Sequence, residues 1–264
     1  MTEEIIQNRD SIQRMKGLTI QSAARAVHGR LCAYSEDRGW HETADVSDRA
    51  IASVVTDSRK AEKDCLFAAI RGQHVDGHRF IPQCAAAGAA AVLAEELPEG
   101  GLEIPVILTD DTLGALRDLA EYYLAVLQIP AVGIIGSVGK TSTKEVTAAV
   151  LARKFRVLKT EGNFNNELGV PLTIFRLREE DELAVLEMGI NHFGEMSRLA
   201  KIVRPRAVIM TNIGFSHIEY LGSQEGILRA KSEVFEYLDR EGCAVLNADD
   251  PLLASLAERK DLLS

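Results

Sequence analysis

The 264-residue sequence lacks several features that would each define a class of protein. No apolar run reaches the ~18 residues that a membrane-spanning helix needs, and residues 1–16 lack the apolar core of a signal peptide. The chain also has no internal repeat, no low-complexity segment and no run of basic residues. We therefore do not expect a membrane-inserted protein, a secreted precursor or a repeat protein.

Cysteine is scarce, and no two cysteines form a C-x-x-C pair. This spacing argues against a zinc site or a redox pair. The simpler interpretation, with no functional role for the cysteines, is that the thiols are reduced and that some are small core residues. Together with the missing signal peptide, this usage indicates a reducing cytoplasm. The four cysteines are Cys32, Cys65, Cys84 and Cys243.

The composition is that of an ordinary globular protein, with 46% hydrophobic and 26% charged residues. It excludes wholesale disorder, a collagen-like fibre and a disulfide-stapled miniprotein. Lys plus Arg number 30 and Asp plus Glu 39, so the formal charge is −9. An acidic chain of this kind is a poor candidate for wrapping nucleic acid or lying on an anionic membrane. Backbone N–H groups and one lysine can still bind an anion locally.

The first half of the chain predicts a small α/β domain after a ragged leader at residues 1–17. Thr19 is placed to cap a short helix that runs through Val27, and Asp110 or Asp111 to cap a long helix. Pro130 stops that long helix, so a domain joint is expected near residues 128–130. Strands are expected at 51–56, 65–70, 89–93 and 105–109, and a small helix at 80–87.

The second half alternates short apolar strands with helices, which predicts a doubly wound, parallel α/β sheet. The helices begin near Lys140, Asn166, Gly194 and Glu225, and one more helix is expected at 251–263. The predicted strands are 131–135, 155–158, 183–187, 207–211 and 244–247.

A glycine-rich loop follows the first of these strands and opens a helix. Its glycines allow several backbone N–H groups to face one anion, and the helix N-terminus adds partial positive charge. Lys140 can then reach the β- and γ-phosphates of a nucleotide, and the Thr141 hydroxyl can bind Mg²⁺. The spacing is a compact G-x-x-G-K-T form of the usual motif, and the alternative is a turn that merely caps a helix. The loop residues are Gly136, Ser137, Val138, Gly139, Lys140, Thr141 and Ser142.

Further polar residues lie at or after the ends of the later strands, where ligands bind in open α/β sheets. Glu187 ends one strand and could hold Mg²⁺ or be an exposed strand end. Taken alone, His217 and Lys231 are more typical of surface residues. Residues 247–251 (Asn-Ala-Asp-Asp-Pro) could bind a base or ribose, or cap the next helix. Residues 163–166 (Asn-Phe-Asn-Asn) suit hydrogen-bond-rich ligands, turns or caps.

Taken together and in their order along the chain, these and several other motifs resemble the motifs of the Mur ligases of bacterial cell-wall synthesis. The resemblance runs from about Leu18 to the last residue. Single motifs of this kind are weak, but their order is specific. The resemblance is strongest to the branch that joins D-alanyl-D-alanine to a UDP-N-acetylmuramoyl-tripeptide, because of the segments at 163–166 and 187–196. The other motifs are at 56–59, 66–69, 72, 76–81, 88–89, 136–144, 162–173, 211–214, 217, 230–233 and 247–251.

The resemblance implies an ATP- and Mg²⁺-dependent amide ligase that works through an acyl phosphate. Its partners would be UDP-N-acetylmuramoyl-tripeptide and D-alanyl-D-alanine, with no nucleic acid, no membrane insertion and a monomeric state. Residues 18–128 would form the N-terminal, UDP-substrate-binding domain, and 129–264 the central, ATP-binding domain.

The resemblance also implies roles for individual residues. Lys140, Glu187, His217 and Lys231 would be catalytic, and Thr141, Glu187, His217 and Lys231, the last as a carbamate, would hold metal. Asn247 and Asp250 would join the phosphate loop in binding ATP. The substrate-binding residues would be Asp57, Ser58, Arg59, Gly72, Asp76, Gly77, His78, Asn163, Asn165 and Asn166.

The chain departs from the family in two places. Mur ligases usually have a third domain, so we expect that domain to be absent here and the central domain to be incomplete. At Lys63-Asp64 the family usually has a glycine, a change expected to affect a turn. The alternatives are a module that binds the UDP-substrate or nucleotide without turnover, another Mur-type ligase, or a folate polyglutamylating enzyme. A switch GTPase is less consistent, since no N-K-x-D motif is present.

Overall fold

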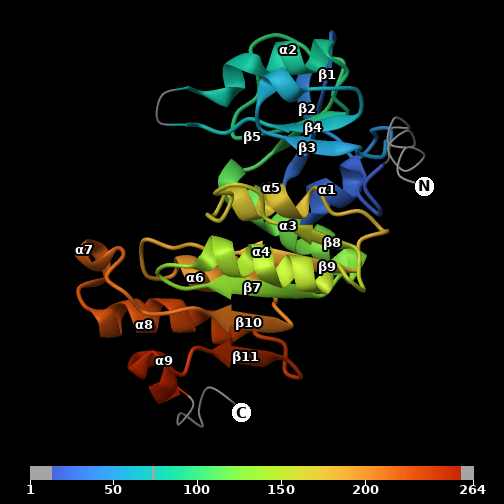
Figure 1. Cartoon of the computed structure of the whole chain (residues 1–264). Helices are drawn as coiled ribbons and strands as arrows, with labels where there is room; N and C mark the ends of the chain where they lie inside the picture. The colour runs from blue at the N-terminus through green and yellow to red at the C-terminus, as the bar shows by residue number, and fades with distance from the viewer. Residues whose placement is uncertain (1–13, 73–74, 257–264) are drawn as a thin grey trace. The chain divides into compact units, whose positions relative to one another are not determined.

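The structure is a computed structural model that describes residues 14–72 and 75–256 (Figure 1). Its contacts divide the chain into two compact units, with the boundary between Val126 and Leu127. Most of the expected leader and the end of the helix expected at 251–263 lie outside the described residues. Each unit is a mixed α/β structure, which confirms the predicted fold class.

The first unit contains a six-stranded sheet with the order β2-β1-β6-β5-β4-β3. Strands β3 to β6 are parallel, whereas β1 pairs antiparallel with both β2 and β6. The strands are β1 (Arg30–Ser35), β2 (Gly39–Glu42), β3 (Ser53–Val55), β4 (Cys65–Ala68), β5 (Ala91–Ala94) and β6 (Val106–Leu108). The helices are α1 (Ile20–Ala26), α2 (Ile81–Ala86) and α3 (Thr112–Leu127), with 3₁₀ turns η2 (Ser58–Lys60) and η3 (Gly77–Phe80).

Local sequence accounts for several of these elements. Thr19 caps α1 as predicted, in a reciprocal capping box with Ser22. Every residue of β4 and β5 is buried, as expected for central parallel strands. Asp64, in the turn where the family usually has glycine, has a φ of +63°, a backbone region in which aspartate is better tolerated than most residues.

The antiparallel hairpin of β1 and β2 was not predicted. Its strands are short and mostly half-buried, so they lack the apolar run that marks β4 and β5. The signal for the turn is Gly39, which has a φ of +66°.

The second unit contains a five-stranded sheet with the order β11-β10-β7-β9-β8, and all of its pairs are parallel. The strands are β7 (Ala131–Ile135), β8 (Val157–Lys159), β9 (Leu183–Glu187), β10 (Ala207–Met210) and β11 (Cys243–Leu246). The helices are α4 (Lys140–Leu151), α5 (Gly169–Ile174), α6 (Glu195–Val203), α7 (Ile218–Leu221), α8 (Gln224–Ser232) and α9 (Pro251–Leu256), with the 3₁₀ turn η4 (Glu233–Tyr237).

This sheet confirms the predicted doubly wound arrangement. Strands β8 and β9 lie on one side of β7, and β10 and β11 lie on the other, so the order reverses beside β7. Helix α4 packs over β7, β8 and β9 (Figure 1). Because all five strands are parallel, the segments that follow them meet at one edge of the sheet, where α/β proteins bind ligands.

The described cysteines carry no disulfide, as predicted. Cys32, Cys65 and Cys84 are buried and Cys243 is exposed. Burial raises the pKa of the Cys84 thiol to about 11, which keeps it protonated. No described helix is long and apolar enough to cross a membrane.

Candidate active site

The loop after β7 has a backbone that requires glycine at two points. Gly136 has a φ of +145°, and a Cβ there would lie 1.9 Å from Thr211 Oγ1. Gly139 has a φ of +79° and forms the N-cap of α4. The loop therefore turns tightly between strand and helix and presents the N-terminus of α4, as the sequence predicted.

Two residues at the end of β10 hold this loop in shape. Asn212 accepts hydrogen bonds from the amide of Ser137 at its backbone oxygen (3.0 Å) and from the amide of Val138 at its side-chain oxygen (3.1 Å). The Thr211 hydroxyl donates to the carbonyl of Val138 (2.6 Å). The sequence analysis gave neither residue a role in the site. Their place at the end of a strand next to β7 was the signal available.

Two lysine amines converge on one carbonyl of the loop. Lys140 Nζ and Lys231 Nζ each lie 3.1 Å from the oxygen of Gly136. Burial lowers the pKa of Lys140, and the nearby Glu187 carboxylate opposes that effect. Burial, and then the charge of Lys140, lower the pKa of Lys231 to about 8. Lys231 is only 3% exposed, so this residue of α8 is buried with its amine beside the loop and is not a solvent-exposed surface lysine.

The carboxylate of Glu187 lies beside the same loop and is 2% exposed. Its Oε2 accepts a hydrogen bond from the Thr141 hydroxyl (3.0 Å), and its Oε1 accepts one from Asn165 Nδ2 (2.8 Å). The Glu187 amide donates to the hydroxyl of Thr160 (3.0 Å), which the sequence analysis did not single out. The structure thus brings together Thr141 of α4, Glu187 at the end of β9, and Asn165 from the segment between β8 and α5.

The hydrogen-bond donors of this site suit a phosphate group, and its oxygen ligands suit a magnesium ion. Helix α4 has no side-chain cap, so its first amides are free to bind an anion. The Ser137 hydroxyl is buried and has no hydrogen-bond partner within the described residues. Carboxylate and hydroxyl oxygens, as in Glu187 and Thr141, are the hard ligands that Mg²⁺ prefers.

His217 lies at the edge of this group. It is exposed, adopts a left-handed backbone with a φ of +64°, and precedes α7. Its neighbour Ser216 donates a long hydrogen bond to the carbonyl of Ser137 (3.5 Å). No hydrogen bond in the described part of the chain joins the His217 side chain to Glu187 or Lys231.

The remaining candidates of the second unit serve mainly in local structure. Asp250 accepts from the amides of Ile213, Leu252 and Leu253, so it ties the segment after β10 to the start of α9. Asn247 Nδ2 donates to the Thr211 carbonyl (3.0 Å). The Asn166 side chain accepts from the amides of Leu168 and Gly169 ahead of α5 (3.2 and 2.7 Å). Asn163 is exposed.

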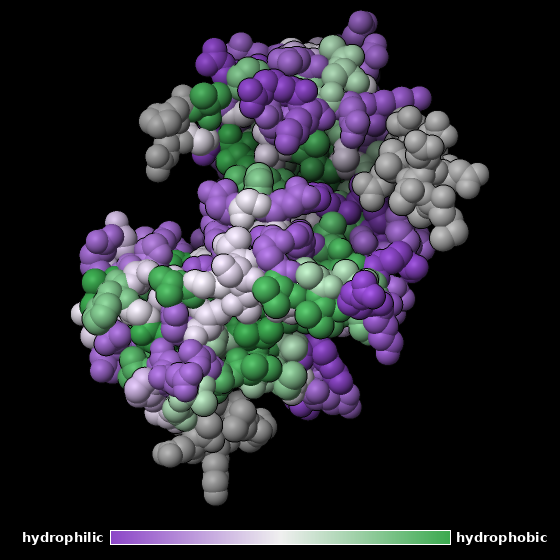
Figure 2. Space-filling view, viewed as in Figure 1, coloured by the Kyte–Doolittle hydropathy of each residue, from purple (hydrophilic) through white to green (hydrophobic). Residues whose placement is uncertain are grey.

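Exposed apolar side chains gather on and next to α7. Figure 2 shows hydrophobic residues on the surface at this helix. The exposed residues are Phe193 (38%), Phe215 (69%), Ile218 (36%) and Tyr220 (54%).

The loop of residues 57–59 in the first unit forms the turn η2. The Arg59 guanidinium pairs with the Asp57 carboxylate (2.7 Å), and this hydrogen bond lowers the pKa of Asp57 to about 2. The Asp57 side chain also accepts from the Arg59 amide (3.1 Å), so it caps the turn that begins at Ser58. Arg59 itself is largely exposed and available to an anion.

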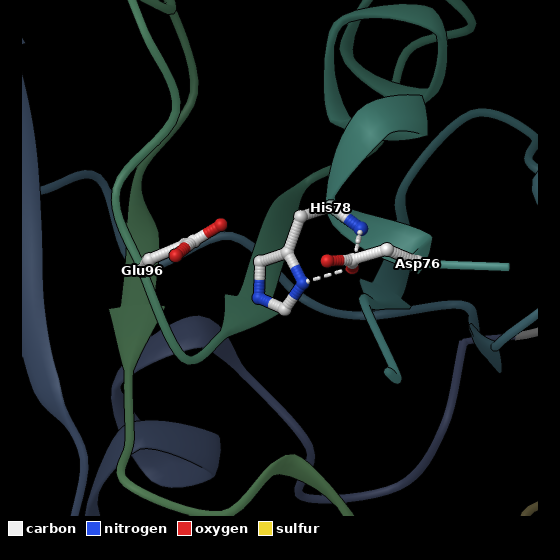
Figure 3. A group of neighbouring side chains, drawn as sticks. All are labelled: Asp76, His78 and Glu96. Atoms are coloured by element: carbon white, nitrogen blue, oxygen red, sulfur yellow. Dashed lines mark hydrogen bonds and ion pairs between the residues drawn. The ribbon is translucent and has the colours of Figure 1, made fainter. Parts of the chain in front are cut away.

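The second loop of this unit ends in a cluster of polar side chains (Figure 3). Ligand atoms of Asp76, His78 and Glu96 lie within 4.8 Å of one another. These residues do not fit a metal ion. Both ring nitrogens of His78 have partners, namely Asp76 Oδ1 (2.7 Å) and the Glu95 amide (3.0 Å). The cation that neutralises the carboxylates is Arg71, which lies 2.6 Å from Glu96.

Residues 134–262 match the Mur ligase middle domain, and residues 50–123 match the catalytic domain of the Mur ligase family. The chain is 46% identical over 236 residues to a UDP-N-acetylmuramoyl-tripeptide–D-alanyl-D-alanine ligase of Bacillus subtilis, covering 89% of this chain and 50% of that protein. It is 39% identical to the ligase of the same name in Escherichia coli, covering 77% and 45%.

Solved structures give the same picture. MurF from Acinetobacter baumannii matches with a TM-score of 0.82 and 34% identity, covering 93% of this chain and 52% of that one. MurF from Thermotoga maritima in complex with ADP matches with a TM-score of 0.72 and 33% identity, covering 78% and 48%. The chain spans about half the length of the curated relatives it matches.

Proposed function

Because the chain belongs to the Mur ligase family, we propose that it supplies the UDP-substrate-binding and ATP-binding parts of an amide ligase. The reaction would join D-alanyl-D-alanine to UDP-N-acetylmuramoyl-tripeptide. The relatives of that name, at 35–46% identity, support this choice of substrates. We propose a monomer that binds neither nucleic acid nor membrane.

One observation carries the proposal. Two lysine amines, a buried carboxylate and a threonine hydroxyl gather around the loop that precedes α4. Cations beside free helix amides suit the β- and γ-phosphates of ATP. A carboxylate with a hydroxyl suits the magnesium that accompanies them.

Lys140 and the loop amides would bind the phosphates. In the structure the Lys140 amine donates to the carbonyls of Gly136 and Ser137. We propose that it turns to the phosphate oxygens when ATP enters, because a charged acceptor binds an ammonium group more strongly than a carbonyl does. Asn247 and Asp250, after β11, would border the nucleoside.

Thr141 and Glu187 would hold Mg²⁺, which neutralises phosphate charge when bound. His217 would join as a further ligand, with Lys231 as a carbamate. A pKa of about 8 leaves part of the Lys231 amine neutral near pH 8. The lone pair of that neutral amine could form an N–C bond with CO₂ and release a proton to water. The charge at this position would then change from positive to negative, as a metal ligand requires.

The first unit would bind the UDP part of the substrate. Its two polar loops, Asp57–Arg59 and Gly72–His78, follow β3 and β4 at the carboxyl edge of the parallel strands. We propose that Asn163, Asn165 and Asn166 contact the peptide part of the substrate.

The proposed reaction has two steps. A carboxylate oxygen of the tripeptide attacks the γ-phosphorus, and the bond to the bridging oxygen breaks to release ADP. The amine of D-alanyl-D-alanine then attacks the acyl carbon, inorganic phosphate leaves, and the amine loses a proton. The protein contributes position and charge in both steps.

Calorimetric titration of this chain tests the proposal. We expect the wild-type chain to bind Mg²⁺–ATP and, separately, UDP-N-acetylmuramoyl-tripeptide. Lys140→Ala should weaken ATP binding by about tenfold or more, since a charged hydrogen bond contributes roughly 1.5–3 kcal/mol. Binding of the UDP compound should not change.

The matched control is Lys154→Ala, because Lys154 is exposed and its Nζ lies 5.2 Å from the centroid of the neighbouring Phe155 ring. If Lys140→Ala binds ATP as tightly as Lys154→Ala, the role of Lys140 is wrong. A wild-type chain that binds folate but no UDP compound would contradict the proposed substrate.

A further inference from the structure

We propose that His78 is a positioning residue of the UDP-substrate loop. Its imidazole ties residues 76–78, in the described part of that loop, to the end of β5 and, through Glu95, to the start of α3. The inference rests on the proposed function only where it assigns this loop to the substrate. The tie itself follows from the hydrogen bonds of the first unit.

The two partners of His78 fix its tautomer. The backbone N–H of Glu95 can only donate, so Nε2 must accept that hydrogen bond (3.0 Å). The proton of the neutral ring is therefore on Nδ1, which donates to Asp76 Oδ1 (2.7 Å). Figure 3 shows the ring of His78 facing Asp76 from the same segment of chain. Because both nitrogens are used, the ring has none left for a ligand.

Glu95 extends this connection to a third element. Its backbone amide binds His78, while its Oε1 accepts from the amide of Thr112, the first residue of α3. The end of β5 thus joins the polar loop on one side and a helix start on the other. These segments follow neighbouring parallel strands β4, β5 and β6, so they share the edge of the sheet where a ligand would bind.

The loop is closed at its base by backbone contacts. The Gly77 amide donates to the carbonyl of Ile70, and the Gly72 amide donates to that of Val75, both at 2.9 Å. A Cβ at Gly77 would lie 2.8 Å from the backbone of Ile70, so glycine is needed there. Two side chains of this segment, His78 and Arg71, then join it to the residues that follow β5.

His78 is the buried member of those side chains. It is 9% exposed, whereas the Arg71 side chain, which pairs with Glu96, is 49% exposed. Exposed ion pairs contribute little, whereas the part-buried amide of Glu95 would lose its acceptor without the imidazole. Loss of the imidazole should therefore free the loop more than loss of the Arg71 pairs does.

Two substitutions separate the two bonds of His78. His78→Asn keeps a donor near the position of Nδ1 but leaves the Glu95 amide without its acceptor. His78→Ala removes both bonds. His41→Gln is the matched control, since His41 lies in the same unit and its ring forms a hydrogen bond within its own turn, with Gly39 O (3.0 Å). If His78→Ala does not fold, His78→Asn carries the test.

Two measurements are made on each full-length chain. Amide hydrogen exchange of Glu95, followed by NMR, should accelerate roughly tenfold or more in both His78 variants. Calorimetry should show an affinity for UDP-N-acetylmuramoyl-tripeptide that is lower by about fivefold or more, with unchanged Mg²⁺–ATP affinity. His41→Gln should match the wild type in both.

If the Glu95 amide exchanged at the wild-type rate in the His78→Asn chain, the inference that His78 ties this segment to β5 would be wrong. Faster exchange with wild-type affinity for the UDP compound would overturn the positioning role. If the wild-type chain itself does not bind the UDP compound, the proposed substrate and the positioning role both fail, and the exchange rates still decide whether the tie exists.

Discussion

The amine of Lys231 is buried and lies near a second cation, Lys140. Both conditions disfavour its charged form and lower its pKa from 10.5 to about 8. In the unfolded chain the same amine regains its ordinary pKa. Between these two values the unfolded state binds more protons than the folded state, so the free energy of unfolding should rise with pH in that interval.

We therefore expect Lys231→Met to reduce this rise. The wild-type chain should gain up to about 3 kcal/mol between pH 8 and pH 10.5 from this residue alone, and the variant should lack that contribution. Urea unfolding of both chains at pH 8 and pH 10 checks it, in buffers freed of CO₂ so that the amine is not carbamylated. Equal pH dependence in the two chains would show that the Lys231 amine is not perturbed.

The proximity of single residues could be predicted where each lies at or after the end of a parallel strand, whereas their roles stay predictions. Lys140, Thr141 and Glu187 lie next to one another, as expected from the carboxyl edge of a parallel sheet. Asn212 and Thr160 were missed because they act on the backbone of other residues. A hydrogen bond between distant loops leaves no spacing in the sequence by which it could be recognised.

At the scale of elements, α6 has its N-terminal amides satisfied from another part of the chain. Its N-cap is Gly194, which has no side chain to offer. The carboxylate of Glu233 accepts from the amides of Gly194 (2.9 and 3.0 Å) and Ser197 (3.2 Å). This carboxylate also suits the positive end of the helix. It joins α6, which follows Glu187 along the chain, to the segment that carries Lys231.

Replacing this cap should destabilise the second unit. We expect Glu233→Ala to lower the free energy of unfolding by about 1–2 kcal/mol, the usual cost of a lost N-cap. The control is Glu219→Ala, because Glu219 is an exposed carboxylate on α7. Urea unfolding measures both. A Glu233→Ala chain as stable as the Glu219→Ala chain would mean that water replaces the cap without loss.

The elements with clear apolar patterns were predicted from the sequence. The bounds expected for β7 and β9 match the structure, and α4 begins at the expected Lys140. Helix α7 was missed because four residues are too few for a helical period to be seen. The β1–β2 hairpin was missed for the related reason that its burial pattern is weak.

At the scale of the whole molecule, a net charge of −9 opposes the approach of anionic ligands. The proposed binding of ATP and of a UDP compound would therefore depend on local groups in each unit. The second unit supplies the N-terminus of α4, Lys140 and Lys231. The first unit supplies Arg59, which is largely exposed. Because the contacts divide the chain into two units, each ligand should stabilise the unit that binds it.

Differential scanning calorimetry can separate the two effects. We expect two unfolding transitions. Mg²⁺–ATP should raise the midpoint temperature of one, and UDP-N-acetylmuramoyl-tripeptide should raise the midpoint temperature of the other. A ligand at 100 times its Kd adds about 2.7 kcal/mol to the stability of the state that binds it, which is a shift in midpoint temperature on the order of 10 °C for a unit of this size. Lys140→Ala should lose only the ATP shift, and His78→Asn should reduce only the UDP-compound shift. If the chain showed a single transition, and either ligand raised its midpoint temperature, the two units would unfold together. Stability could then not be assigned to one unit at a time.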